Sequence, residues 1–117
     1  MGYVYLIGEK ENPDRYKIGS TRSSNINKRL KQLQTGSSAK LYVKDFCETS
    51  HPFKLEKMLH NHFKSSNIIG EWFELSDDDI RGFKSVCEEK ERIISALKDN
   101  PFYFKIKNQN KAPRLFT

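Results

Sequence analysis

A β-hairpin at the start of the chain is the feature that most limits what it can fold into. Residues 3–7 are β-branched and aromatic, as is typical of a strand, and residues 15–20 form a second short strand pattern. The residues between them, 11–14, include Asn12 and Pro13 and predict a turn. Because two strands joined this closely pair antiparallel, the chain is not a doubly wound nucleotide-binding fold, whose parallel strands alternate with helices.

The segment after the hairpin predicts a helix and a third strand. Ser24 and Asn25 are candidate N-caps for a helix that has Ile26, Leu30 and Leu33 at helical spacing and ends at Gly36. Residues 41–48 alternate in the manner of a strand.

The second half predicts a helix, a strand and a helix. Ser50 or His51 is expected to cap a helix that has Leu55, Met58 and Leu59 as its apolar stripe. Residues 70–75 predict a fourth strand, and residues 76–97 a third helix. The order β-β-α-β-α-β-α indicates an α/β protein of the α+β type, with a mainly antiparallel central sheet flanked by helices.

A length of 117 residues is typical of one domain. We expect residues 1–99 to form it and residues 100–117 to be a basic, aromatic C-terminal extension. Within that extension, residues 102–107 alternate as an edge strand or a docked segment would. No apolar run approaches the roughly 20 residues that span a bilayer, and the start shows no signal-peptide pattern. These features predict an intracellular protein of the cytoplasm or nucleus, without a membrane partner.

Positive charge is concentrated in one part of the chain. The net charge is +6, and residues 15–44 hold eight Lys or Arg and no Asp or Glu. Such a stretch creates a field that suits a polyanion, although a solvated basic face would look the same. The common phosphate-binding glycine patterns are absent, so no nucleotide cofactor is expected.

The two cysteines, Cys47 and Cys87, lie forty residues apart without a CxxC partner. We interpret them as small buried thiols of a reducing compartment, and not as a disulfide or a zinc pair. His62 falls in the apolar stripe of the second helix and is expected to be a packed core histidine.

Polar residues at the borders of the apolar stripes are the candidates for chemistry. Arg29 borders the stripe of the first helix, and Glu56 borders that of the second, with His60 one turn further along. Taken singly, each is an ordinary surface side chain.

The sequence resembles the GIY-YIG nuclease superfamily. Tyr3-Val4-Tyr5 is followed about a dozen residues later by Lys17-Ile18-Gly19, and then come Arg29-Leu30, Glu56 and Gly70-Glu71-Trp72-Phe73. The resemblance covers roughly residues 2–80. It is closest to the compact branch of phages, large DNA viruses and some fungi, in which the second signature tends to read Lys-Ile-Gly. It implies a GIY-YIG-like domain that acts on DNA.

The resemblance also implies a role for each matching residue. Glu56 matches the glutamate that binds a single Mg²⁺ or Mn²⁺, and a hard carboxylate suits such an ion. Arg29 matches an arginine whose planar fork suits a phosphate. Tyr5 matches a tyrosine that orients the attacking water or the phosphate. His60 is our own addition, because one helical turn from Glu56 it is placed for the outer shell of the metal or for a proton transfer.

The chain departs from the family pattern at both signatures. Lys17 stands where the nucleases have a tyrosine proposed as general base, and Tyr3 stands where the first signature has glycine, with Gly2 one place earlier. A lysine is protonated at neutral pH. Lys17 is therefore expected to clamp a phosphate, with Tyr5 or a metal-bound water as base, or to become the base itself if it is buried beside Arg29.

Three functions follow from these features. The first is a metal-dependent DNA endonuclease with Tyr5, Lys17, Arg29, Glu56 and His60 as its catalytic residues. The second is a DNA-binding module of the same fold with weak or no catalysis. The third is a protein–protein interaction domain that uses Trp72, Phe73 and the aromatic tail. The DNA contacts are expected from Lys17, Arg22, Lys28, Arg29, Lys31 and Lys40.

Overall fold

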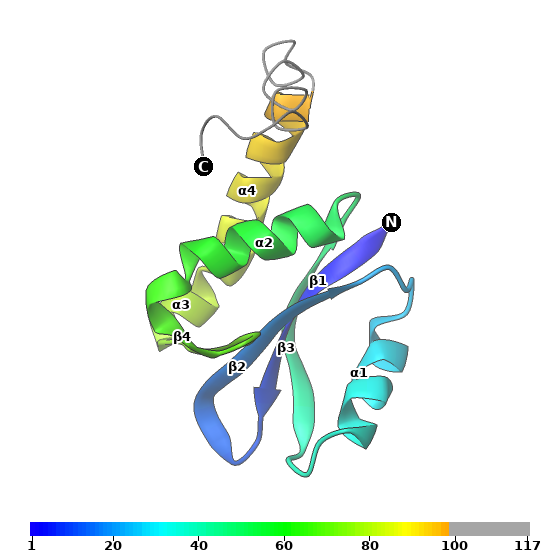
Figure 1. The fold of residues 1–117 in the computed structure, drawn as a ribbon, viewed down its shortest axis with the longest axis vertical. Coiled ribbons are helices and arrows are strands. Elements are labelled where there is room, and N and C mark those ends of the chain that lie inside the picture. Colours follow the sequence, from blue (N-terminus) through cyan, green and yellow to red (C-terminus); the bar gives the residue numbers. More distant parts are fainter. Residues whose placement is uncertain (99–117) are drawn as a thin grey trace, which may run out of the picture.

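A five-stranded antiparallel sheet organises the computed structural model, which describes residues 1–98 (Figure 1). The strand order is β3-β1-β2-β5-β4, and every neighbouring pair runs antiparallel. Helices cover both faces. The expected α+β architecture is therefore confirmed, whereas the proposed extension, residues 100–117, lies outside the described residues.

The hairpin of β1 (Gly2–Glu9) and β2 (Asn12–Thr21) forms the centre of the sheet. The turn is tighter than the sequence predicts, because β2 begins at Asn12 and includes Pro13. The pairing shifts register between Gly8 and Glu9, and Pro13 is exposed near the start of its strand. A proline is tolerated there because strand starts and bulges do not require its missing N–H group.

Helix α1 (Ile26–Thr35) follows the expected capping. The Asn25 side chain accepts hydrogen bonds from the backbone N–H groups of Asn27 and Lys28, and the helix ends at Gly36. Strand β3 (Leu41–Thr49) then pairs with the other edge of β1, so β1 is buried in the middle of the sheet.

Helix α2 (Pro52–His62) buries Leu55 and Leu59, as its stripe predicts. The expectation for His62 is wrong, because this side chain is exposed. Its neighbour Phe63, which follows the helix, is 5% exposed and packs in the core. The larger apolar surface of Phe63 gains more from burial than an imidazole does.

The predicted fourth strand is present but shorter than expected, and an additional strand precedes it. A 3₁₀ turn, η1 (Lys64–Ser66), leads into β4 (Asn67–Ile69), and β5 (Trp72–Glu74) pairs with both β4 and β2. Gly70 has a φ of 53°, in the left-handed region that favours glycine. A turn therefore falls where the sequence pattern predicts the start of a strand, and it carries Glu71.

The predicted third helix is divided in two. Ser76 caps α3 (Asp77–Arg81) through a capping box with Asp79, as the acidic start predicts. Gly82 ends α3, and α4 (Phe83–Lys98) follows. Gly82 is a poor helix former, which explains why the break falls there.

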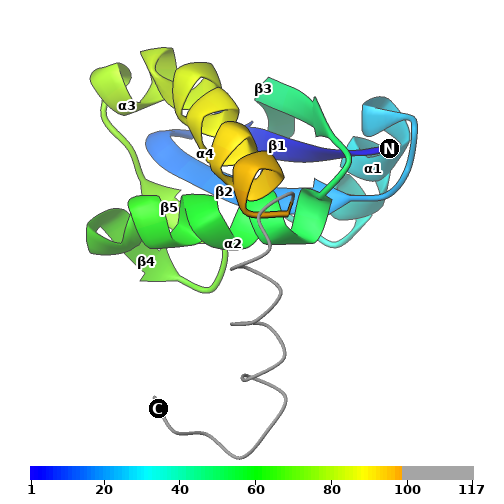
Figure 2. The ribbon, with the colours of Figure 1, turned by 90° about the horizontal axis from the view of Figure 1, so that it is seen from above.

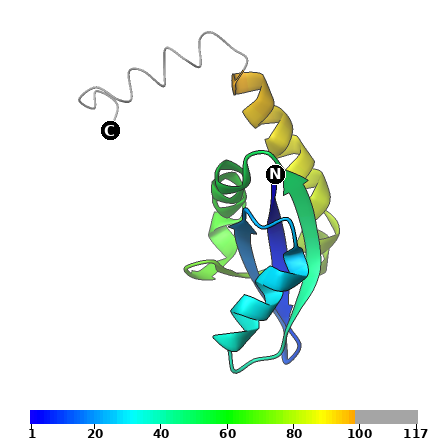
Figure 3. The ribbon, with the colours of Figure 1, turned by 90° about the vertical axis from the view of Figure 1, so that its right-hand side faces the viewer.

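Two hydrophobic clusters lie on opposite faces of the sheet, because neighbouring strand residues point to opposite sides. One includes Val4, Ile18 and Phe73 with residues of α2 and α4, which pack side by side (Figure 2). The other includes Tyr5 and Ile7 with residues of α1, which lies apart from α2 and α4 (Figure 3). No helix within residues 1–98 is long and apolar enough to cross a membrane.

Candidate active site at the edge of β2

The candidate site begins at Tyr5, a residue of β1 whose side chain extends across the neighbouring strand β2. Its side chain is 1% exposed, and a Cβ atom built on Gly19 would lie 2.5 Å from the Tyr5 hydroxyl oxygen. Tyr5 and Gly19 are paired across the two strands, so the phenol lies over the glycine and points towards the far edge of β2. Beyond Lys17, β5 no longer pairs with β2. Groups from both faces of the sheet can therefore meet at this edge.

Arg29 joins Tyr5 from α1. Its Nε donates a long hydrogen bond of 3.4 Å to the Tyr5 hydroxyl oxygen, and its Nη1 donates to Oε1 of Gln32 at 3.3 Å. Burial raises the pKa of Tyr5 above its ordinary value, and the hydrogen bond from Arg29 opposes that rise. Arg29 as a whole residue is half-buried, so it has hydrogen-bonded partners and still reaches the surface.

Glu56 reaches the same edge from α2, on the opposite face of the sheet. The Ser20 hydroxyl donates to Glu56 Oε1 at 2.5 Å, and the Glu56 side chain is 18% exposed. Burial raises the pKa of Glu56 above its ordinary value; the Ser20 hydrogen bond lowers it, and the nearby charge of Glu71 raises it. A carboxylate held away from water in this way gains strongly from a cation.

Glu71 is the functional candidate that sequence reasoning missed. It lies on the β4–β5 turn, where its carbonyl accepts a hydrogen bond from Ile18 N at 2.9 Å, and its carboxyl lies within hydrogen-bonding reach of Glu56. Its Oε1 also forms an ion pair with Lys17 Nζ at 3.2 Å. The available signal is Gly70, because glycine is typical of a turn, although residues 70–75 also fit the pattern of a strand.

Lys17 lies beside the site, and its partner is the carboxylate of Glu71. The Lys17 side chain is 19% exposed. Arg29, beside which burial would have made Lys17 a base, hydrogen-bonds with Tyr5 and Gln32. The position that the family gives to a tyrosine is thus occupied here by a cation bound to a carboxylate.

His60 lies one turn from Glu56, as expected, and its ring is directed into the sheet. Its Nε2 is 2.8 Å from the carbonyl oxygen of Ile18 and 3.6 Å from Glu56 Oε2. Because a carbonyl oxygen only accepts, Nε2 carries the proton and donates. The ring also packs edge-on against Phe73, with centroids 5.0 Å apart. The His60 ring is therefore held between the Ile18 carbonyl oxygen, the Glu56 carboxylate and Phe73.

The basic residues predicted to contact DNA do not form a single patch. Arg22 lies at the end of β2, where its guanidinium stacks over Phe53 at 5.0 Å. Lys40 lies near the other end, because its carbonyl oxygen accepts a hydrogen bond from Lys10 N beside the β1–β2 turn. Lys28 and Lys31 are exposed on α1 between them. These positively charged side chains are therefore spread along β2 and α1, from one end of β2 to the other.

The site offers oxygen ligands to a metal ion. Among residues 1–98, no three His, Cys, Asp or Glu side chains converge into a ready-made cage. Two neighbouring carboxylates, Glu56 and Glu71, nevertheless fit a hard divalent cation that keeps several waters and takes further oxygens from a phosphate, as Mg²⁺ does.

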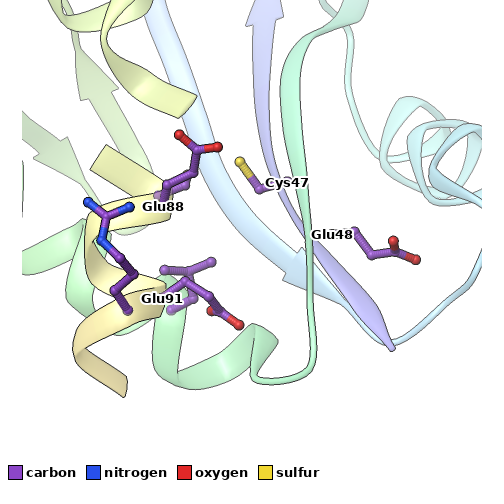
Figure 4. Close-up of a pocket in the computed structure, with 7 residues that line it drawn as sticks. Cys47, Glu48, Glu88 and Glu91 are labelled. Atoms are coloured by element: carbon purple, nitrogen blue, oxygen red, sulfur yellow. The ribbon is translucent and has the colours of Figure 1, made fainter. Parts of the chain in front are cut away.

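A separate cavity of about 360 Å³ lies between β3 and α4 (Figure 4). Cys47, Glu48, Glu88 and Glu91 line it, and the Cys47 sulfur points towards α4. The two cysteines are free, as predicted. Cys87 is buried, whereas Cys47 is only half-buried, and the neighbouring Cys87 thiol lowers the pKa of Cys47. This cavity shares no lining residue with the edge of β2.

Comparisons with known proteins identify the family of the chain. Uncharacterized protein 460R of Invertebrate iridescent virus 6 is 37% identical over 104 residues, which cover 86% of this chain and 46% of the viral protein. The chain thus spans less than half the length of that relative. No solved structure matches the chain. The family model of the T5orf172 domain matches residues 2–89. The chain therefore belongs to the T5orf172 domain family, a phage- and virus-associated domain in the group related to GIY-YIG and HNH-like endonucleases.

Proposed function

We propose that the protein is a GIY-YIG-type DNA endonuclease that hydrolyses phosphodiester bonds with one divalent metal ion. The observation that carries this proposal is the convergence of Tyr5, Arg29 and Glu56 at the edge of β2, from three segments far apart in the sequence. Simple phosphate binding requires no carboxylate, which would repel the ligand. A carboxylate pair beside a guanidinium suits metal-assisted hydrolysis of a phosphate ester.

Each residue has a chemical task in this proposal. Glu56 holds the ion, Mg²⁺ or Mn²⁺, and Glu71 offers a second oxygen ligand beside it. The ion, when bound, supplies charge stabilisation to the phosphate and to the leaving oxygen. Arg29 holds a non-bridging phosphate oxygen through its guanidinium. Hydrolysis adds water across the P–O bond and leaves a phosphate monoester and a sugar hydroxyl.

Tyr5 and Lys17 complete the site. The raised pKa of Tyr5 keeps its phenol protonated at neutral pH, so it orients the attacking water or the phosphate as a hydrogen-bond partner. Lys17 clamps a phosphate, because an ammonium paired with Glu71 is not available to accept a proton. His60 positions Glu56 through its contact with the carboxylate and with the β2 carbonyl.

A DNA-binding module with weak catalysis is the second candidate. The observation that favours it is Lys17, which takes the place of the second-signature tyrosine and forms an ion pair with Glu71. The interaction-domain reading is weakened, because Phe73 is 1% exposed and cannot form a surface. The aromatic tail that it also requires lies outside the described residues.

A nicking assay on supercoiled plasmid tests the proposal. With Mg²⁺ or Mn²⁺ the wild-type chain is expected to convert plasmid to the nicked form, and EDTA to stop the reaction. Glu56→Gln should lose at least about 100-fold in rate, because removing a charged transition-state contact has effects of this size. Its DNA affinity, measured by fluorescence anisotropy, should be kept.

Glu74→Gln is the matched control, because Glu74 is an exposed carboxylate on β5. It should nick at the wild-type rate. A wild-type chain that binds DNA and does not nick with either ion would support the binding module. Equal nicking by wild type and Glu56→Gln would remove Glu56 from the mechanism.

A further inference from the structure

A second cavity opens directly beside the candidate active site. It holds about 460 Å³ and lies between the C-terminal end of α1 and the edge formed by β2 and β5. Volumes of this order accommodate a small organic ligand. The residues that line it include Arg15, Lys17, Gln32, Ser37, Ser38 and Trp72.

The cavity joins the candidate active site at two points. Lys17 lines the cavity and is also bonded to Glu71. Gln32 lines it too, and its Oε1 accepts a hydrogen bond from Arg29. A group bound in the cavity therefore lies against Lys17, and Gln32 links the cavity wall to Arg29. This position beside the site suits the nucleotide next to the phosphate that is cut.

Trp72 gives the cavity an aromatic wall. It is paired with Lys17 across β5 and β2, so its ring lies on the α1 face of the sheet, half-buried against the Tyr5 cluster. The cations of Arg15 and Lys17 lie 5.1 Å and 5.6 Å from the ring centroid. Proteins that bind single strands combine aromatic side chains, on which bases stack, with cations that hold the phosphates.

The remaining walls suit the edge of a base. Gln32 offers an amide and Ser37 and Ser38 offer hydroxyls, which donate to and accept from heterocycles. Glu9 also lines the cavity, but its carboxylate is paired with Arg15 Nε at 3.5 Å and accepts from Asn12 at 3.1 Å. The cavity thus presents neutral hydrogen-bonding groups, an aromatic face, two cations and one carboxylate that is already paired with Arg15.

The geometry points to a nucleobase subsite: the cavity takes one unstacked base of the DNA strand that is cut, stacked on Trp72, with its phosphate held by Lys17 and Arg15. This inference rests on the proposed function and adds to it a substrate feature, a base removed from the helical stack. An enzyme that takes up such a base favours DNA in which that base is already unpaired, because unpairing costs free energy.

Fluorescence reports on the subsite directly, because Trp72 is the only tryptophan of the chain. The experiment uses the full chain with Glu56→Gln, in EDTA, so that no cleavage occurs. It is titrated with a single-stranded DNA oligonucleotide and with an abasic oligonucleotide of equal length. Both carry the same phosphates. We expect the base-containing strand to quench the fluorescence strongly and the abasic strand to leave it nearly unchanged, although both bind by anisotropy of a label.

Substitution then tests the energetic contribution of the ring. Trp72→Ala should weaken binding of the base-containing strand by about 5- to 150-fold, the effect of one base stacked on an aromatic side chain, and leave the abasic strand unaffected. Trp72→Phe should recover most of the loss, which separates stacking from folding. Phe46→Ala is the matched control, because Phe46 is an exposed aromatic paired with Lys84 at 5.6 Å and does not line the cavity.

The outcomes distinguish this inference from the proposed function. Equal quenching by the two strands, or equal binding by wild type and Trp72→Ala, overturns the subsite and leaves the endonuclease proposal standing. A folded chain that binds neither strand also overturns the subsite, whereas a wild-type chain that fails to nick plasmid overturns the endonuclease proposal on which the subsite rests.

Discussion

The phenol of Tyr5 lies over Gly19, so close that a single added methyl group at the glycine would stand 2.5 Å from the Tyr5 hydroxyl oxygen. The second signature residue therefore has a structural task. By having no side chain, Gly19 allows Tyr5 to cross from the centre of the sheet to the edge where Glu56 and Glu71 also lie.

Gly19→Ala is expected to displace Tyr5 and to reduce nicking by about 100-fold, since a misplacement of about 1 Å costs this much. Overpacking should also lower the stability by about 1–3 kcal/mol. Plasmid nicking and thermal melts measure the two effects. Gly36→Ala is the control, because a Cβ there meets only the Leu33 carbonyl oxygen at 3.8 Å. Equal nicking activity of Gly19→Ala and Gly36→Ala would show that Tyr5 does not need the space left by the missing side chain of Gly19.

Glu56→Gln is expected to stabilise the metal-free protein at neutral pH while it abolishes cleavage. Burial raises the pKa of Glu56 in the folded chain above its ordinary value of 4.5. The folded state therefore binds a proton more tightly than the unfolded state, and this residue's contribution to stability falls as the pH rises from 4.5 through the folded pKa. A neutral glutamine has no such loss.

Thermal melts at pH 4 and pH 7 in EDTA check this prediction. The melting temperature of Glu56→Gln should exceed that of wild type at pH 7, and the difference should shrink at pH 4, where both states of the wild type hold the proton. Glu74→Gln, at an exposed carboxylate, should show no such pattern. A difference in melting temperature between wild type and Glu56→Gln that is the same at both pH values would contradict the prediction that burial disfavours the charged form of Glu56.

Ser20→Ala is expected to move the acid limb of the pH–rate profile to higher pH. The Ser20 hydroxyl donates a hydrogen bond to Glu56 and lowers the pKa of Glu56. Without this hydroxyl, burial raises the pKa of Glu56 further. Metal binding needs the ionised carboxylate, which would then form only at higher pH. Nicking rates from pH 5 to pH 9 measure the shift. Ser23→Ala removes a nearby hydroxyl that bonds to the backbone, and should leave the limb in place.

Replacing Lys28 and Lys31 by glutamine is expected to reduce the salt dependence of DNA binding. Each lost phosphate contact on duplex DNA removes about 0.9 from the slope of log affinity against log salt. Anisotropy titrations between 50 and 200 mM salt, roughly the range over which such contacts are felt, measure the slope. Lys90→Gln on α4 is the control, because Lys90 pairs with Glu89 away from β2 and α1. Equal slopes for all variants would remove α1 from the DNA interface.

Cys47 is expected to react with iodoacetamide faster than Cys87 in the native protein. Its pKa is lowered by the hydrogen bond with Cys87, and the same contact, with burial, raises the pKa of Cys87. Because the thiolate is the nucleophile, the half-exposed Cys47 should be modified first. Peptide mass spectrometry after timed alkylation measures both sites, with Cys47→Ser as the control. Equal labelling of Cys47 and Cys87 in the folded chain would contradict the predicted difference in their reactivity.

The sequence alone determined the elements whose signals are local. Asn25, Gly36 and Ser76 mark helix ends because capping groups satisfy backbone atoms only two or three residues away. The alternation of β1 and β2 predicted the hairpin, since side chains in a strand repeat with period two. The quoted motifs named Tyr5, Arg29 and Glu56, although nothing in their spacing shows how the three meet.

Tertiary structure decided the composition of the site. Ser20 and Glu56 are 36 residues apart, and Arg29 and Tyr5 are 24 apart, so only strand pairing and helix packing bring them together. The turn at Gly70 brings Glu71 to Lys17 and Glu56 because the backbone reverses there, whereas the sequence pattern predicted a continuous strand. Local preferences fix where elements begin and end, while the position of a side chain in space depends on the packing of the whole sheet.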